Sequence, residues 1–180
     1  MAVLTLLLSK AAHRIADFTA TITMAAVTVI SFYLLGTAKT AYWMGGWFPP
    51  FGITLVYDGL SALLLLIVNS VGLLAIIYSL SYMEKYTAKP KYYSLFLLMV
   101  AGMNGVVLTG DLFNMFVFLE IASLASYALV GFGVEHEELE ASFKYLILGT
   151  VASTMILLGI GLTYASTGSV NMADASRVLA

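Results

Sequence analysis

Residues 112–130, LFNMFVFLEIASLASYALV, decide the fold class of this chain. The run is almost wholly apolar and nearly as long as the roughly 20 residues that a helix needs to cross a bilayer. A single glutamate, Glu120, lies near its centre. Burying an ionised carboxylate at that depth costs several kcal/mol unless it is protonated or paired. The stretch therefore predicts a membrane-spanning helix whose one charge needs an explanation.

The composition of the whole chain points to the same solvent. Of its 180 residues, 61% are hydrophobic and 10% are charged, and the mean hydropathy is +0.97. A soluble domain has about a quarter of its residues charged, so this chain is expected to lie in the lipid bilayer. Its net charge of -2 argues against a nucleic-acid partner, because such a partner needs a positive surface.

The sequence contains no pattern typical of a catalytic centre. It has no cysteine, which excludes disulfides, zinc fingers and cysteine-bound iron–sulfur clusters. It also has no phosphate-binding loop, dinucleotide fingerprint, HExxH motif or nucleophile elbow. We therefore expect no catalytic residues, no cofactor and no metal site in this chain.

Five segments are long and apolar enough to span a membrane. They are Ile15–Leu35, Leu55–Tyr82, Tyr92–Thr109, Leu112–Phe132 and Leu139–Tyr164. The first stretch, Ala2–Ser9, rises only about 12 Å as a helix and is expected to be the tail of a truncated helix or a short half-helix. The prediction is a single all-α domain over residues 1–180, a multi-spanning transmembrane helix bundle of five full helices plus that short or truncated first helix.

The connections set the expected orientation of the bundle. Residues Thr40–Phe51 contain Gly-Gly, Pro-Pro and two tryptophans, which favours a hairpin loop at the membrane surface. Glu84–Lys91 and Glu135–Glu140 are expected to be charged loops. One side of the bundle then carries most of the basic residues, namely Lys10, Arg14, Lys85, Lys89 and Lys91, against Lys39 and Arg177 on the other. Because basic residues favour the cytoplasmic side, the hairpin loop is predicted to be extracytoplasmic.

Three charged residues lie at or near the ends of the spans. Asp58 and Asp111 each precede an apolar run, where an acid caps a helix and meets the positive end of its dipole. Asp58 is also a candidate for ion translocation, because the Gly-Leu-Ser that follows it suggests a closely approached site. Lys144 either extends to the cytoplasmic interface with Glu140 as its partner or acts as a proton relay or electrostatic modulator of a buried acid.

Glu120 is the strongest candidate for ion or proton handling. It lies about 13 residues, or roughly 20 Å, from the cytoplasmic end of its segment, which is too far for its side chain to reach the interface. Ser123 and Tyr127 share its helix face and can hydrogen-bond a carboxylate, while Phe113 and Phe116 make the setting apolar. An apolar setting favours the neutral form of a carboxyl group. The alternative is a protonated structural glutamate that joins two helices.

Polar and small residues elsewhere in the spans are expected to be helix-packing contacts. They are Asn69, Asn104, Gly102, Gly105, Gly149 and Ser153.

Three long blocks of the sequence resemble the antiporter-like proteins. The blocks are GGWFPPFGITLVYDGLSALLLL (residues 45–66), GDLFNMFVFLEIASLASYALVGFG (110–133) and LEASFKYLILGTVASTMILLGIGLTYASTGSVNMADAS (139–176). The family comprises the D-type subunit of Mrp cation/proton antiporters, the matching subunit of membrane-bound hydrogenases and related archaeal complexes, and the proton-pumping subunits of complex I. The resemblance covers nearly the whole chain and corresponds to the N-terminal half of such a subunit.

The resemblance implies a role for two residues. Glu120 matches the essential glutamate of the family's fifth helix, and Lys144 matches a lysine common in the sixth. In the family, the glutamate works with a lysine on a broken seventh helix and with further basic residues beyond it. Relatives are well over twice as long, so we expect this chain to be a fragment or a natural half subunit that lacks half of the proton path.

The resemblance also implies partners and a location. We expect a proton- or cation-translocating subunit in the plasma membrane, surrounded by lipid and by other membrane subunits of a redox-driven complex or a cation/proton antiporter. These partners would include the second half of the fold. The resemblance leaves open whether the translocated ion is the proton alone or also sodium. A non-conducting assembly subunit and a small self-contained transporter or channel are the other functions that the sequence allows.

Overall fold

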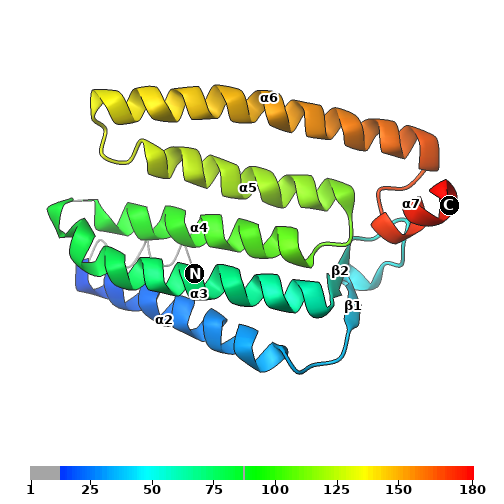
Figure 1. Ribbon diagram of the computed structural model, residues 1–180, viewed down its shortest axis with the longest axis horizontal. Helices are drawn as coiled ribbons and strands as arrows, with labels where there is room; N and C mark the ends of the chain where they lie inside the picture. Colours follow the sequence, from blue (N-terminus) through cyan, green and yellow to red (C-terminus); the bar gives the residue numbers. More distant parts are fainter. Residues whose placement is uncertain (1–12, 87) are drawn as a thin grey trace.

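The computed structural model describes residues 13–86 and 88–180, and in these ranges five long helices form one bundle (Figure 1). All five are long and apolar enough to cross a membrane. They are α2 (His13–Leu34), α3 (Gly59–Tyr82), α4 (Lys89–Leu108), α5 (Leu112–Val130) and α6 (His136–Thr167). The predicted multi-spanning all-α bundle is thus confirmed. The expected short first helix, Ala2–Ser9, lies outside the described residues.

Short connections join α3 to α4, α4 to α5 and α5 to α6, so that these neighbours along the chain run antiparallel, while the hairpin segment joins α2 to α3. In Figure 1, α3, α4, α5 and α6 lie side by side in chain order, and α2 packs against α3 and α4. At one end of the bundle lie residues 83–86 and 131–135, and we call this the loop end. The other end carries a two-stranded sheet and a short helix, α7 (Met172–Leu179), and we call it the hairpin end.

The predicted hairpin is present, and it is longer than expected. Strand β1 (Thr40–Trp43) pairs antiparallel with β2 (Thr54–Tyr57), with Thr40 opposite Tyr57. The prediction of a helix from Leu55 is therefore wrong, because residues 55–57 belong to β2. A strand is favoured here because Thr54, Val56 and Tyr57 have high β propensity and find a partner strand, while Asp58 caps a helix that begins at Gly59.

The two charged loops at the loop end are shorter than predicted. Helix α6 begins at His136, so most of Glu135–Glu140 is helical rather than loop. The Glu135 and Glu138 side chains form a reciprocal capping box, and acids in the first turn interact favourably with the helix dipole. Likewise α4 begins at Lys89 with Pro90 in its first turn, a position at which proline's missing N–H costs no hydrogen bond.

The buried core lies among α2, α3 and α4. Its apolar members are Ala16, Ala20, Met24, Ile76, Tyr93, Phe96, Leu97 and Val100. A line of buried polar groups crosses the same three helices. The Asn69 side-chain amide donates to the Ser31 hydroxyl at 2.8 Å, and the Asn104 amide donates to Asn69 Oδ1 at 2.9 Å. Because lipid offers no hydrogen bonds, such links join helices, as predicted for Asn69 and Asn104.

The helices α4 and α5 approach closely because glycines line their contact. A Cβ added to Gly102 would lie 2.7 Å from the backbone nitrogen of Ala122, and one added to Gly105 would overlap the Phe118 ring. The predicted packing role of these glycines is confirmed. Helix α6, by contrast, buries only Ser153 and Ile160 among its residues, and most of its surface is exposed.

Candidate functional site

Glu120 lies near the middle of α5, the third of the four side-by-side helices. Helix α5 ends at Val130, so Glu120 is about 15 Å from its loop end rather than the expected 20 Å. It is about 12 Å from the other end, at Leu112, by the same count. Glu120 therefore lies near the middle of the membrane-spanning helix, as predicted, although the helix is shorter than the sequence indicated.

The packing of α5 shows which way Glu120 faces. Phe118 and Ala122 contact the glycines of α4, and Glu120, two residues from each, lies about 200° around the helix from both. Tyr127, seven residues further on, shares the Glu120 face. The Tyr127 ring packs edge-to-face on Tyr145 of α6, at 4.6 Å between centroids. Glu120 therefore faces the sparsely covered α6 side of the bundle.

One oxygen of the Glu120 carboxyl group is buried and unpaired in the part of the chain that the structure describes. This atom is Oε1, which has no hydrogen-bond partner among those residues. The expected supporting residues do not supply one: Ser123 accepts at its carbonyl from Ser126, and the Tyr127 hydroxyl lies against Gly149. A buried carboxyl oxygen without a donor is stable when the group is neutral or when a partner arrives from elsewhere.

Lys144 does not approach Glu120. It forms an ion pair with Glu140, one turn earlier on α6, and its side chain is 69% exposed. Ser142, Tyr145 and Gly149 contact Tyr127, which places Lys144 about 10 Å from Glu120 along the bundle axis. Because α6 begins at His136, Lys144 lies about 12 Å from its start, not the 8 Å that the sequence indicated. The predicted Glu140 partner is confirmed.

Asp58 and Asp111 are helix caps, as predicted. The Ser61 backbone N–H donates to Asp58 Oδ1 at 2.8 Å, and the Asn114 N–H donates to Asp111 Oδ1 at 2.7 Å. The backbone hydrogen bond from Ser61, followed by the one from its hydroxyl, lowers the pKa of Asp58. Asp58 is thus held in its charged form at the hairpin end.

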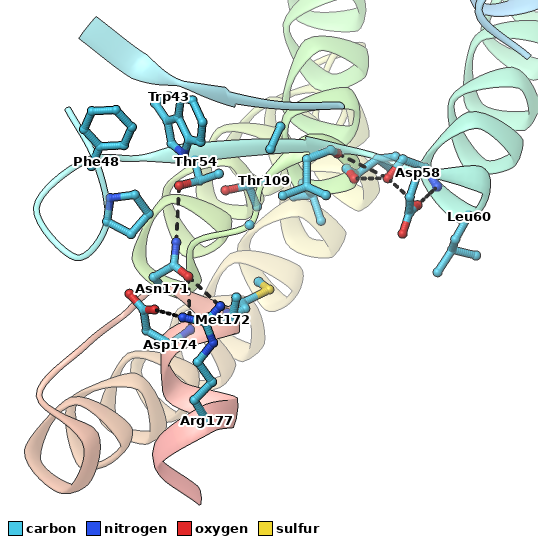
Figure 2. Close-up of a pocket in the computed structure, with 18 of the residues that line it drawn as sticks. Trp43, Phe48, Thr54, Asp58, Leu60, Thr109, Asn171, Met172, Asp174 and Arg177 are labelled. Atoms are coloured by element: carbon cyan, nitrogen blue, oxygen red, sulfur yellow. Dashed lines mark hydrogen bonds and ion pairs between the residues drawn. The ribbon is translucent and has the colours of Figure 1, made fainter. Parts of the chain in front are cut away.

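Asp58 also lines a pocket with a volume of about 830 Å³ (Figure 2). Figure 2 shows Trp43 and Phe48 on the hairpin side and Arg177 of α7 below. The Asn171 amide donates to the Thr54 hydroxyl at 3.3 Å and so ties the start of α7 to β2. The pocket places Asp58 near an opening at the hairpin end but does not bring it near Glu120 or Lys144.

Comparison with known proteins decides the family. The family model described as "NADH:quinone oxidoreductase/Mrp antiporter, TM" matches residues 109–179, which include Glu120 and Lys144. A second, "NADH-Ubiquinone oxidoreductase (complex I), chain 5 N-terminus", matches residues 47–93. The chain belongs to the antiporter-like subunit family. Like its relatives, it is a multi-pass protein of the cell membrane.

Relatives of this antiporter-like subunit occur in several complexes. It is 48% identical over 140 residues to NADH-quinone oxidoreductase subunit N of Desulforudis audaxviator (strain MP104C), covering 77% of this chain and 28% of the relative. It is 44% identical over 139 residues to the D-type subunit of a probable K(+)/H(+) antiporter of Rhizobium meliloti (strain 1021), covering 77% of this chain and 25% of the relative.

A solved structure shares the fold closely. It is that of the membrane-bound sulfane sulfur reductase, an archaeal respiratory membrane complex, and it contains a chain of 32% sequence identity. The TM-score is 0.91, with 98% of this chain and 37% of that chain covered. This antiporter-like subunit therefore spans between a quarter and somewhat over a third of the length of these relatives. The relatives are subunits of multisubunit membrane complexes.

One charged pair of this antiporter-like subunit was missed by reasoning from the sequence. Asp17 on α2 lies 3.7 Å from Lys89 at the start of α4, at the loop end of the bundle. The sequence contained a usable signal, because Asp17 is an acid inside a segment predicted to span the membrane, as Glu120 is. Because Asp17 lies only two residues from the start of the predicted segment, it resembles the residues that are expected at the membrane surface.

Proposed function

We propose that this chain carries the proton- or cation-translocating glutamate of an antiporter-like subunit, and that Glu120 is that residue. The observation that supports the proposal is the buried Oε1 of Glu120, which has no donor among the described residues and faces the open side of the bundle. An acid kept at mid-membrane without a fixed partner is suited to exchanging a proton. Leucine would fit the same position at lower cost if only packing mattered.

A positive group outside the described residues is part of this proposal. Within those residues no ion pair reaches Glu120, and Lys144 is paired with Glu140. We therefore place a basic group of another segment or another subunit near Glu120, directly or through water. Moving a charge by a few ångströms in a low-dielectric site changes the energy of the carboxylate enough to load or release a proton. The ion is a proton, with sodium as the alternative cation.

Lys144 and Asp58 have secondary roles in the proposed path. Lys144 is the nearest basic side chain along α6 and adjusts the field at Glu120 from about 10 Å away. Asp58 is charged beside the opening at the hairpin end, where it attracts cations. Ser123 and Tyr127 hold water near the Glu120 carboxyl on the shared helix face.

A non-conducting assembly subunit is the second candidate. It is favoured by one observation, the distance that separates Glu120 from Lys144, the basic side chain nearest to it along α6. In that case the carboxyl group of Glu120 stays protonated and serves helix packing alone.

The substitution Glu120→Gln separates the two functions. Glutamine keeps the shape of the side chain and can hydrogen-bond, but it cannot exchange a proton. In the full complex we expect normal assembly and loss of ion transport, measured as pH-gradient formation in membrane vesicles, while Glu120→Asp keeps part of the activity. The exposed Glu137, changed to glutamine, is the matched control and should transport normally. Full transport by an assembled Glu120→Gln complex would make the assembly function correct.

A further inference from the structure

A second group of ionisable side chains lies at the loop end, between α2, α3 and α4. The Lys89 ammonium lies 3.7 Å from Asp17 Oδ2 and donates a hydrogen bond of 3.4 Å to the backbone carbonyl of Leu80. The side chains are well covered, with exposed fractions of 11% for Lys89 and 25% for Asp17. Lys89 therefore contacts two other helices through one ammonium group.

The carboxyl group of Asp17 is not fully paired. Its Oδ1 atom is buried and has no hydrogen-bond partner among the residues that the structure describes. The hydroxyl of Tyr93, which is completely buried on α4, forms no hydrogen bond of standard geometry among these residues, but it lies close enough to the Asp17 side chain to interact with it. Buried polar atoms are normally satisfied, and one proton on the Asp17 carboxyl group would let it donate to the Tyr93 hydroxyl.

Asp17 is also accessible. A pocket of about 320 Å³ is lined by Asp17, Phe18 and Thr21 of α2 and by Leu80 of α3. The pocket is open to the surface at the loop end, so a proton from water can reach the carboxyl group without crossing the core. A pair that only fastened two helices together would gain nothing from such an opening.

We propose that Asp17 is a second proton-binding site of this subunit, with Lys89 as its counter-charge and Tyr93 as its hydrogen-bonding neighbour. A proton from water adds to the Asp17 carboxylate and gives a neutral carboxyl group, whose O–H can donate to the Tyr93 hydroxyl. The Lys89 ammonium then keeps its bond to the Leu80 carbonyl. Among the described residues, Lys89 is the charged group that faces Asp17, and Tyr93 is the other titratable group beside it.

This inference rests on the proposed transport function and places a proton acceptor at the loop end, which the basic residues predict to be cytoplasmic. Glu120 lies about 15 Å from that end by helix rise, so the two acids occupy different depths. They also lie on different sides of the bundle, because Asp17 lies among α2, α3 and α4 whereas Glu120 faces α6, so the second site is separate from the first.

The test uses the full complex in membrane vesicles and measures transport as a function of pH. The variant Asp17→Asn keeps the shape of the side chain but binds no proton. We expect it to assemble and to lose transport by about tenfold or more, because a positioned proton-transfer group typically contributes about 10²-fold. The exposed Glu84 at the same end, changed to glutamine, is the control and should behave as the wild type.

A double variant separates proton binding from a purely structural pair. The double variant Asp17→Asn, Lys89→Gln leaves no buried charge without a partner. If the Asp17–Lys89 pair only joins helices, this variant should assemble and transport normally. If Asp17 is a proton-binding site, the double variant should assemble normally and should transport as poorly as Asp17→Asn alone. In Lys89→Gln alone, the counter-charge of the proton-binding carboxylate is lost, so the dependence of transport on pH should differ from that of the wild type.

Two results would overturn the inference. One is wild-type transport in Asp17→Asn or in the double variant, and the other is an unchanged pH profile in Lys89→Gln. If Asp17→Asn does not assemble, Asp17→Glu is tested in its place. This variant should transport ions with a changed dependence of transport on pH. A dependence equal to that of the wild type would also overturn the inference. Loss of transport in Glu120→Gln together with normal transport in Asp17→Asn would leave the proposed function intact and remove only the second site.

Discussion

At the scale of single residues, the same side-chain type serves different purposes according to depth. Asp58 and Asp111 lie at helix starts, where backbone N–H groups satisfy their carboxylates. Glu120 and Asp17 lie inside helices, where the backbone offers no free donor, and each keeps one buried oxygen unpaired. The first two acids stabilise helices, and the last two are the ones we assign to proton exchange.

Lys144 can be tested in the same way. If its charge acts on Glu120, Lys144→Ala should reduce coupled ion transport more than assembly, and Lys144→Arg should keep part of the activity. Normal transport in the alanine variant would mean that Lys144 only extends to the interface. The exposed pair with Glu140 would then contribute about 0.3–0.5 kcal/mol to the helix.

At the scale of helices, close contacts between α4 and α5 hold the Glu120 helix in place. Gly102 and Gly105 let Ala122 and Phe118 approach α4, and this approach turns Glu120 toward α6. In a membrane, where apolar side chains gain little by leaving lipid, small residues of this kind provide much of the packing energy. The direction in which Glu120 points is therefore set by two glycines on another helix.

Substituting one of these glycines should loosen the bundle. In Gly102→Ala the new methyl group meets the backbone of α5, and overpacking of this kind costs about 1–3 kcal/mol, which exceeds the gain of about 1 kcal/mol in helix propensity. We expect a lower thermal midpoint and weaker assembly in detergent. Gly159→Ala on α6 is the control, because nothing lies near its added methyl group, and it should be neutral or slightly stabilising.

At the scale of the whole molecule, the two ends of the bundle differ in construction. At the hairpin end the connections are joined by backbone hydrogen bonds: Gly110 donates to Thr54, Leu112 donates to Val170, and Met172 donates to Gly110. At the loop end the helices are held by side chains, such as the Asp17–Lys89 pair. The loop end also carries most of the basic residues, which predicts that it faces the cytoplasm.

Labelling of single cysteines tests this orientation, and the sequence has no cysteine of its own to interfere. Phe51 is 89% exposed in the hairpin, and Glu84 is exposed at the loop end, so both are suitable positions. A membrane-impermeant reagent added to intact cells should label Phe51→Cys and leave Glu84→Cys unlabelled until the membrane is opened. The reverse pattern would show that the bundle is inverted.

Much of the fold was predictable because lipid imposes a simple rule on length and polarity. The five spans, the hairpin between the first two and the caps at Asp58 and Asp111 follow from apolar runs, turn residues and acids at helix starts. The errors fall at the ends of elements, at residues 55–57 and 135–140. There, pairing with strand β1 and a capping box between Glu135 and Glu138 extended the ordered elements beyond what the apolar pattern indicated.

The sequence by itself determined that the chain is a membrane bundle and that Glu120 is its central charge, because hydropathy and the position of a charge along a helix are local properties. Only the tertiary structure decided that Glu120 faces α6, that Lys144 lies away from it, and that Asp17 meets Lys89. These facts depend on which helix faces approach one another. That choice is made by glycines and buried amides on different helices, and no single segment contains it.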